Sequence, residues 1–168
     1  VPLRLSELGR ESGPRLLQPD EDQRKAIAGA LGIVALPALF AEVEAVPWHD
    51  GAEIRGTWSA RVTYSCGLTL EPFDADLEGA FSVRAVPPSS PLAGAPAAGA
   101  ELELDLEADD PPDEITDGVL PLGAYVVEDL SLAIDPFPRK PGVDFQPPPE
   151  PSEPSPFAAL ARLKNPDA

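Results

Sequence analysis

Cysteine and histidine are almost absent from this chain of 168 residues, which has one of each, Cys66 and His49. A single cysteine cannot form a disulfide within the chain. A tetrahedral zinc site needs about four thiolate or imidazole ligands, and this chain has only one cysteine and one histidine, so we exclude a zinc site within the monomer. A cysteine nucleophile would need a base nearby, and His49 lies in a predicted turn, so we do not expect a cysteine–histidine enzyme.

Positive charge is also scarce, because 12 lysine and arginine residues face 29 acidic ones and the formal net charge is −17. A field of this sign repels phosphate backbones, which argues against nucleic-acid binding over the whole surface. The charge is still compatible with a local basic patch on the surface, or with binding to a basic protein partner.

Long hydrophobic runs are missing as well. The uncharged stretch of residues 26–41 is shorter than the ~18 residues of a membrane span, and Gly29, Gly32 and Pro37 interrupt it. We therefore expect a cytoplasmic protein with no membrane partner.

Proline, by contrast, is abundant, with 23 residues, and nine of them lie between Pro136 and Pro156. This bias predicts a single domain over residues 1–145, an extended linker over 146–156 and a short amphipathic tail helix over 157–168. The stretch "PPSSPLAGAPAAGA", residues 87–100, reads as a long flexible loop between strands.

Alternation of apolar and polar residues predicts long, half-buried strands at residues 53–65 and 74–86. Residues 101–107, "ELELDLE", alternate in the same way, and residues 39–46 form a weaker candidate that leads into the turn signal Asp50-Gly51. Four or more antiparallel strands are expected from these patterns.

Two helices flank the predicted strands. Asp20 and Gln23 form a capping box that opens the first helix, and Gly32 is its stop signal. The second helix runs from about Pro121 and ends before Pro136. The predicted fold is α+β, a mainly antiparallel sheet with two flanking helices and a short C-terminal helix, and a barrel-like closure of the sheet is one alternative.

Three segments, in this order and spacing, resemble the YceD family of bacterial large ribosomal RNA subunit accumulation proteins. They are "CGLTLEPF" (residues 66–73), an acidic stretch ending in "DG" (residues 117–118) and "LAIDPFPRKPG" (residues 132–142). The form resembles that of alphaproteobacterial members, which share a tail like "FAALARLK" after a linker. The resemblance covers about residues 3–142 and the tail. It implies a non-enzymatic factor without a cofactor, which supports accumulation of large-subunit ribosomal RNA and assembly of the large ribosomal subunit.

The resemblance implies mainly structural roles for the positions of the family motifs in this chain. They are Cys66, Pro72, Phe73, Asp117, Gly118 and Pro138. Many members carry a second cysteine where this chain has Thr69, which again argues against zinc. We interpret Cys66 as a small buried side chain, because alternation along the strand places it on the apolar face.

The implied partner is large-subunit ribosomal RNA or a pre-ribosomal particle, and not DNA. Because the chain is so acidic, we expect the contact to run through a basic ribosomal protein. The candidate cations for a small patch that touches RNA or an acidic partner are Arg139, Lys140, Arg162 and Lys164.

Residues 101–117 hold nine acids and no lysine or arginine, which superficially suggests a calcium site. The segment lacks the ligand spacing and closing glutamate of an EF-hand, so we interpret it as a solvated strand face and a charged loop. The alternative function is a metal-dependent hydrolase that uses the acidic loop 109–117, with Asp109, Asp110, Asp113 and Glu114 as its carboxylates.

Overall fold

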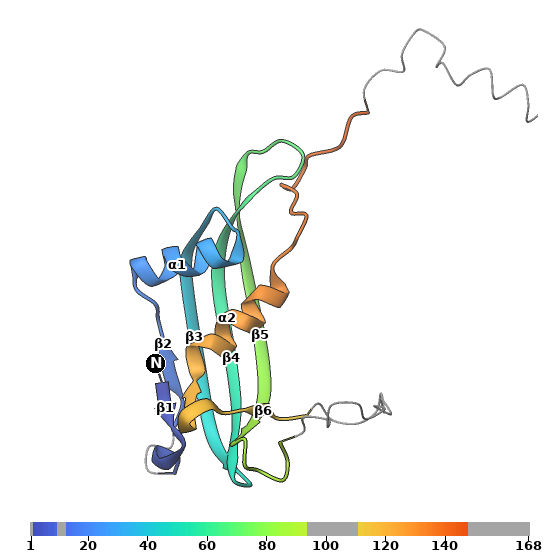
Figure 1. Ribbon diagram of the computed structural model, residues 1–168. Coiled ribbons are helices and arrows are strands. Elements are labelled where there is room, and N and C mark those ends of the chain that lie inside the picture. The colour runs from blue at the N-terminus through green and yellow to red at the C-terminus, as the bar shows by residue number, and fades with distance from the viewer. Residues whose placement is uncertain (1, 10–12, 94–110, 148–168) are drawn as a thin grey trace, which may run out of the picture.

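The computed structural model describes residues 2–9, 13–93 and 111–147. Three long strands stand side by side and a helix crosses them (Figure 1). The helices and strands, in chain order, are β1 (Pro2–Arg4), the 3-10 turn η1 (Leu5–Glu7), β2 (Arg15–Leu17), α1 (Glu21–Leu31), β3 (Ala35–Trp48), β4 (Gly51–Ser65), β5 (Pro72–Val86), β6 (Asp113–Glu114), η2 (Thr116–Gly118), β7 (Val119–Pro121) and α2 (Leu122–Ala133).

The main sheet has five strands in the order β2-β3-β4-β5-β6, and a separate pair joins β1 to β7. All neighbours are antiparallel except β5 and β6, which are parallel. The α+β class and the mainly antiparallel sheet are confirmed. The barrel-like alternative is wrong, because the sheet is open and its two edge strands are too short to close it.

Both flanking helices form where the sequence predicts them. Asp20 Oδ1 accepts from the Gln23 backbone N–H at 2.9 Å, and Gln23 Oε1 accepts from the Asp20 N–H at 3.0 Å, so the predicted capping box opens α1. Gly32 ends α1 in the left-handed region, with φ 68. Helix α2 buries Leu122, Val126 and Leu130 on one side.

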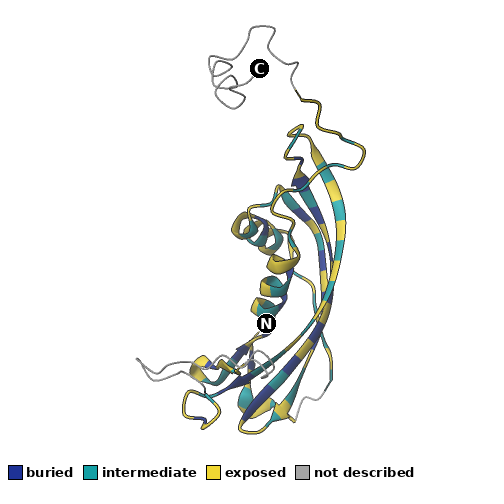
Figure 2. Ribbon diagram, turned by 90° about the vertical axis from the view of Figure 1, so that its right-hand side faces the viewer, coloured by how far each residue is buried: buried dark blue, intermediate teal, exposed yellow. Residues whose placement is uncertain are grey.

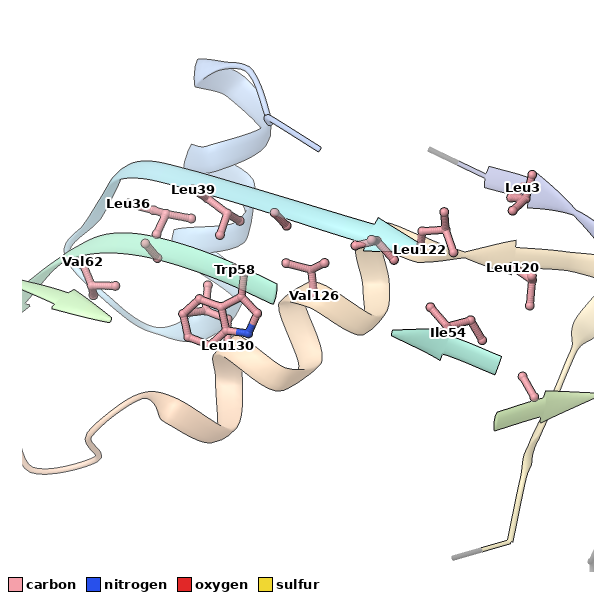
Figure 3. Close-up of a cluster of buried hydrophobic side chains, with 14 of the residues drawn as sticks. Leu3, Leu36, Leu39, Ile54, Trp58, Val62, Leu120, Leu122, Val126 and Leu130 are labelled. Atoms are coloured by element: carbon pink, nitrogen blue, oxygen red, sulfur yellow. The ribbon is translucent and has the colours of Figure 1, made fainter. Parts of the chain in front are cut away.

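The helices cover only one face of the sheet, which we call the inner face. Figure 2 shows the long strands as an arch with the helices inside its curve. In Figure 3, Trp58 of β4 lies against Val126 and Leu130 of α2, and Leu36 and Leu39 of β3 continue the same core. The other side of β3, β4 and β5, which we call the outer face, carries no helix among the described residues.

Two glycines make room for aromatic rings on the inner face. Gly56 of β4 is directly opposite Phe81 of β5, and Trp58 is directly opposite Gly79. A Cβ at Gly79 would lie 2.5 Å from the Trp58 ring, and one at Gly56 would lie 2.6 Å from the Phe81 ring. The Trp58 Nε1 donates to Asp129 Oδ2 at 2.6 Å, which ties the sheet to α2.

The strands differ from the predictions mainly at their ends. Strand β3 runs well beyond the predicted 39–46, because Pro37 lies at a register shift and Pro47 lies where β2 no longer pairs with β3. Strands β4 and β5 each begin two residues earlier than expected. Four predicted segments lie wholly or partly outside the described residues: the strand 101–107, the second half of the loop 87–100, most of the linker 146–156 and the tail helix 157–168. No helix within the described ranges is long and apolar enough to cross a membrane.

Candidate partner-binding site

Two of the family-motif segments meet where β4 turns into β5. The backbone N–H of Gly67 donates to the Pro138 carbonyl at 2.8 Å, and the Lys140 N–H lies 3.5 Å from Cys66 Sγ. The Lys140 ammonium pairs with Glu71 Oε2 at 2.9 Å. Residues 66–71 and 138–140, which we call the Cys66 junction, therefore fasten the chain after α2 to this end of the sheet.

The Cys66 side chain exposes no surface, and it lies outside the main hydrophobic cluster. The backbone N–H of Lys140 is the largest cause that lowers the pKa of the thiol, to about 6, and the Thr69 hydroxyl and the N–H groups of Thr69 and Leu68 add to it. These donors favour the ionised form of a sulfur that exposes no surface. The arrangement suits a turn held by hydrogen bonds to sulfur better than a nucleophile.

The remaining motif positions shape backbone or core. Pro72 is the first residue of β5, and the Phe73 ring lies 5.7 Å from the Tyr64 ring. Asp117 and Gly118 both have positive φ, 55 and 65, and make the turn into β7. Among the described residues, no group of three or more His, Cys, Asp or Glu side chains is placed to hold a metal ion.

The structure brings only part of the predicted basic patch together. Lys140 pairs with Glu71, and their hydrogen bond and opposite charges raise the pKa of Lys140 and lower the pKa of Glu71. Arg139 is exposed beside it, and Arg162 and Lys164 lie outside the described residues. Lys140 thus holds the Cys66 junction together as well as carrying charge.

Exposed acids gather instead on the outer face of the sheet. Their strand positions put Glu42 and Glu44 on β3 and Glu78 on β5, all on the side away from the helices. Within the described part of the chain these three carboxylates have no ion pair, whereas the outer-face cations are engaged: Arg61 with Asp76 at 2.7 Å and Arg55 with Glu53 at 2.7 Å.

Apolar surface accompanies this charge. Phe40 is 50 % exposed on the outer face, directly opposite Ser59, and Leu16 on β2 is 81 % exposed. Two shallow hollows, of about 510 and 350 Å³, border Phe40, and Glu78 lines both. The outer face therefore offers an apolar side chain surrounded by negative charge.

Sequence reasoning did not single out this face. The alternation that predicts β4 and β5 already puts Asp74, Asp76 and Glu78 on one face of β5, but it does not tell which side of the sheet the helices leave uncovered. Of the four acids in the alternative hydrolase site, Asp109 and Asp110 lie outside the described residues. Comparison with known protein families, curated proteins and solved structures finds no match.

Proposed function

We propose that this chain is a non-enzymatic binding protein that supports accumulation of large-subunit ribosomal RNA and assembly of the large ribosomal subunit. In this proposal it holds a basic ribosomal protein, either alone or within a pre-ribosomal particle. The observation that carries the proposal is the outer face of the sheet, where Glu42, Glu44 and Glu78 are exposed without an ion pair among the described residues.

The charge of the whole chain favours a basic partner over naked RNA. At a net charge of −17 the surface attracts cations from a distance and speeds their encounter. Phe40, half exposed amid the acids, supplies an apolar contact that charge alone cannot provide. The resemblance of the segments around Cys66, Asp117 and Pro138 to the YceD family supplies the link to the ribosome.

The test is co-sedimentation of the chain with large-subunit precursor particles at about 50 and about 300 mM salt, a range over which screening removes exposed attractions. The triple variant Glu42→Gln, Glu44→Gln, Glu78→Gln should associate less at low salt, and its association should depend less on salt. A control triple, Glu21→Gln, Asp22→Asn, Asp144→Asn, changes the charge equally at exposed sites off the outer face and should retain most of the association.

Failure of the wild-type chain to sediment with the particles, at either salt concentration, would refute the proposed function. Equal losses in the two triple variants would refute the outer face as the contact. Arg139→Gln tests the basic patch separately, because Arg139 is exposed whereas Lys140 also pairs with Glu71. A weaker association in that variant would favour a contact with RNA or an acidic partner.

A further inference from the structure

Among the described residues, one long edge of the main sheet has almost no partner strand. Strand β5 pairs with β4 from Pro72 to Ala85, but on its other side only Ala85 and Val86 pair, with the two-residue strand β6. Within the described ranges, no strand pairs with residues Pro72 to Val83 on the edge of β5 that faces away from β4. We call this the open edge of β5. In Figure 1, β5 forms the margin of the long strands and β6 lies only at its end.

The hydrogen bonds at β6 show which backbone groups face this edge. The Ile115 N–H donates to the Val86 carbonyl at 2.8 Å, so the backbone groups of Val86 point away from β4. Backbone direction alternates along a strand, and the register of β5 with β4 has no shift. The N–H and C=O groups that face the open edge therefore belong to every second residue, namely Asp74, Asp76, Glu78, Ala80 and Ser82.

The same residues point their side chains to the outer face, because side chains alternate with the same period. Asp74, Asp76 and Glu78 thus place three carboxylates beside the backbone groups that a new strand would bind. A second copy of this edge would bring like charges together, which is unfavourable. The acidic residues 101–107 of the chain itself would meet the same repulsion.

The inner side of the edge carries a hollow that can receive side chains. It measures about 520 Å³ and lies between β5 and α2, where Phe81 and Tyr125 contribute aromatic surface. Leu132 of α2 also lines it and is 81 % exposed. The acids Asp113 and Glu128 border the same hollow. The cation Arg84 lines the hollow too. The outer side of the edge therefore offers negative charge, and the inner side offers a hollow with aromatic and apolar side chains.

We propose that the open edge of β5 binds an extended basic segment of the partner, which adds to the sheet as a further strand. Main-chain hydrogen bonds to Asp74, Asp76, Glu78, Ala80 and Ser82 would supply affinity, as in other cases of strand addition. Lysine or arginine side chains meet the acids of the outer face, and apolar side chains at alternate positions enter the hollow beside Leu132. This proposal rests on the proposed function and names how its partner is held.

The probe is an acetylated and amidated decapeptide of alternating lysine and valine, with binding to the full chain measured by calorimetry. Two matched peptides carry N-methyl groups either on all lysines or on all valines, with the same charge and composition. In a bound strand only one alternate set of N–H groups faces β5, so one methylated peptide should bind at least about tenfold more weakly while the other binds as the parent does. Loss with the lysine set indicates an antiparallel strand, and loss with the valine set a parallel one.

A protein variant tests the same edge from the other side. Ala80→Pro removes an N–H that faces the open edge and leaves the hydrogen bonds between β5 and β4 in place, so it should bind the peptide at least about tenfold more weakly. Ala80→Val keeps that N–H and is the matched control, with binding close to wild type. Hydrogen exchange tests the edge in the unmodified protein. In the unbound chain the amides of Asp76 and Glu78, which face the open edge, should exchange faster than those of Ala75 and Leu77, which face β4. Bound peptide should slow the exchange of Asp76 and Glu78.

Several results would overturn the strand-addition proposal. They are no peptide binding at millimolar concentration, equal binding of all three peptides, slow exchange of Asp76 and Glu78 in the unbound chain, or dimers that form through this edge. If the Ala80→Pro variant sediments with precursor particles as well as the wild type does, the edge of β5 is not the binding site, and the proposed function still stands. If the wild type binds the peptide but does not associate with the particles, the proposed function is rejected and strand addition at the open edge is not.

Discussion

Backbone amides around Cys66 give its thiol an unusual environment. The N–H groups of Lys140, Thr69 and Leu68 and the Thr69 hydroxyl all favour the thiolate, and they lower its pKa to about 6 although the side chain exposes no surface. A buried thiol without such donors would have a raised pKa. The sulfur therefore acts as a hydrogen-bond acceptor that holds a turn.

This environment makes stability depend on pH in a defined direction. The unfolded thiol has a pKa of about 8.5, whereas the folded pKa is about 6. Between these values the unfolded state binds more protons, so the contribution of Cys66 to the free energy of unfolding should rise with pH and level off above about 8.5. It should be lost as pH falls through about 6.

Urea unfolding of the wild type and of Cys66→Ser at a series of pH values between about 5.5 and 9 checks this prediction. The serine hydroxyl does not titrate in that range, so the rise with pH should be absent from the variant. Parallel pH profiles for the two proteins would show that the thiol keeps its proton in the folded state.

At the scale of strands, β4 and β5 fit through alternating large and small residues. Trp58 lies opposite Gly79, and Gly56 lies opposite Phe81, so each ring occupies space that its cross-strand partner leaves empty. A slip by one residue would turn every inner side chain outward. The two aromatic–glycine pairs therefore help to define the register of the hairpin.

Gly79→Ala should destabilise the protein by about 1–3 kcal/mol, because the added methyl group overpacks the site. That Cβ would lie 2.5 Å from the Trp58 ring. Gly29→Ala is the matched control in α1, where the new Cβ meets nothing within 4 Å. It should stabilise by about 0.5–1 kcal/mol through helix propensity. Equal shifts of the urea midpoint in the two variants would contradict this account of the β4–β5 contact.

Much of the fold could be predicted from local patterns. The capping box at Asp20 and the stop at Gly32 mark the two ends of α1, and alternation reveals β4 and β5 because it repeats over many residues. Strands β1, β2, β6 and β7 were missed, since two or three residues show no period. Strand β3 was underestimated because its prolines resemble strand ends, although a proline fits at a bulge or at an unpaired edge.

The candidate site was harder to predict. Lys140 meets Cys66 only because α2 carries the chain along the sheet to the β4–β5 turn, and no local pattern encodes that distance. The acids Glu42 and Glu78 lie on different strands, and only the register places them on one face. Chemistry that depends on long-range pairing is therefore visible only in the folded chain.

At the scale of the whole molecule, charge dominates. The net charge of −17 acts against compaction, because like charges are closer in the folded state than in the unfolded chain. The exposed ion pairs, such as Arg61 with Asp76, offset little of this repulsion, since water screens the attraction between exposed charges.

Added salt should therefore stabilise the protein. The melting temperature should rise between about 10 and about 150 mM sodium chloride, because the Debye length shortens from about 30 to about 8 Å. Thermal unfolding followed by circular dichroism measures this. A melting temperature that falls with salt would mean that the exposed ion pairs outweigh the general repulsion.

The order of the strands also bears on how the protein folds. Strands β3, β4 and β5 are neighbours both in the chain and in the sheet, and only His49 and Asp50 separate the first two. Such hairpins can form outward from their turns, because closing a short loop costs little conformational entropy. The pairing of Pro2 with Pro121 joins the two strands that lie farthest apart in sequence among the described strand pairs, so it costs the most entropy to close. The central meander is thus suited to act as an early template, on which the N-terminal strand docks last.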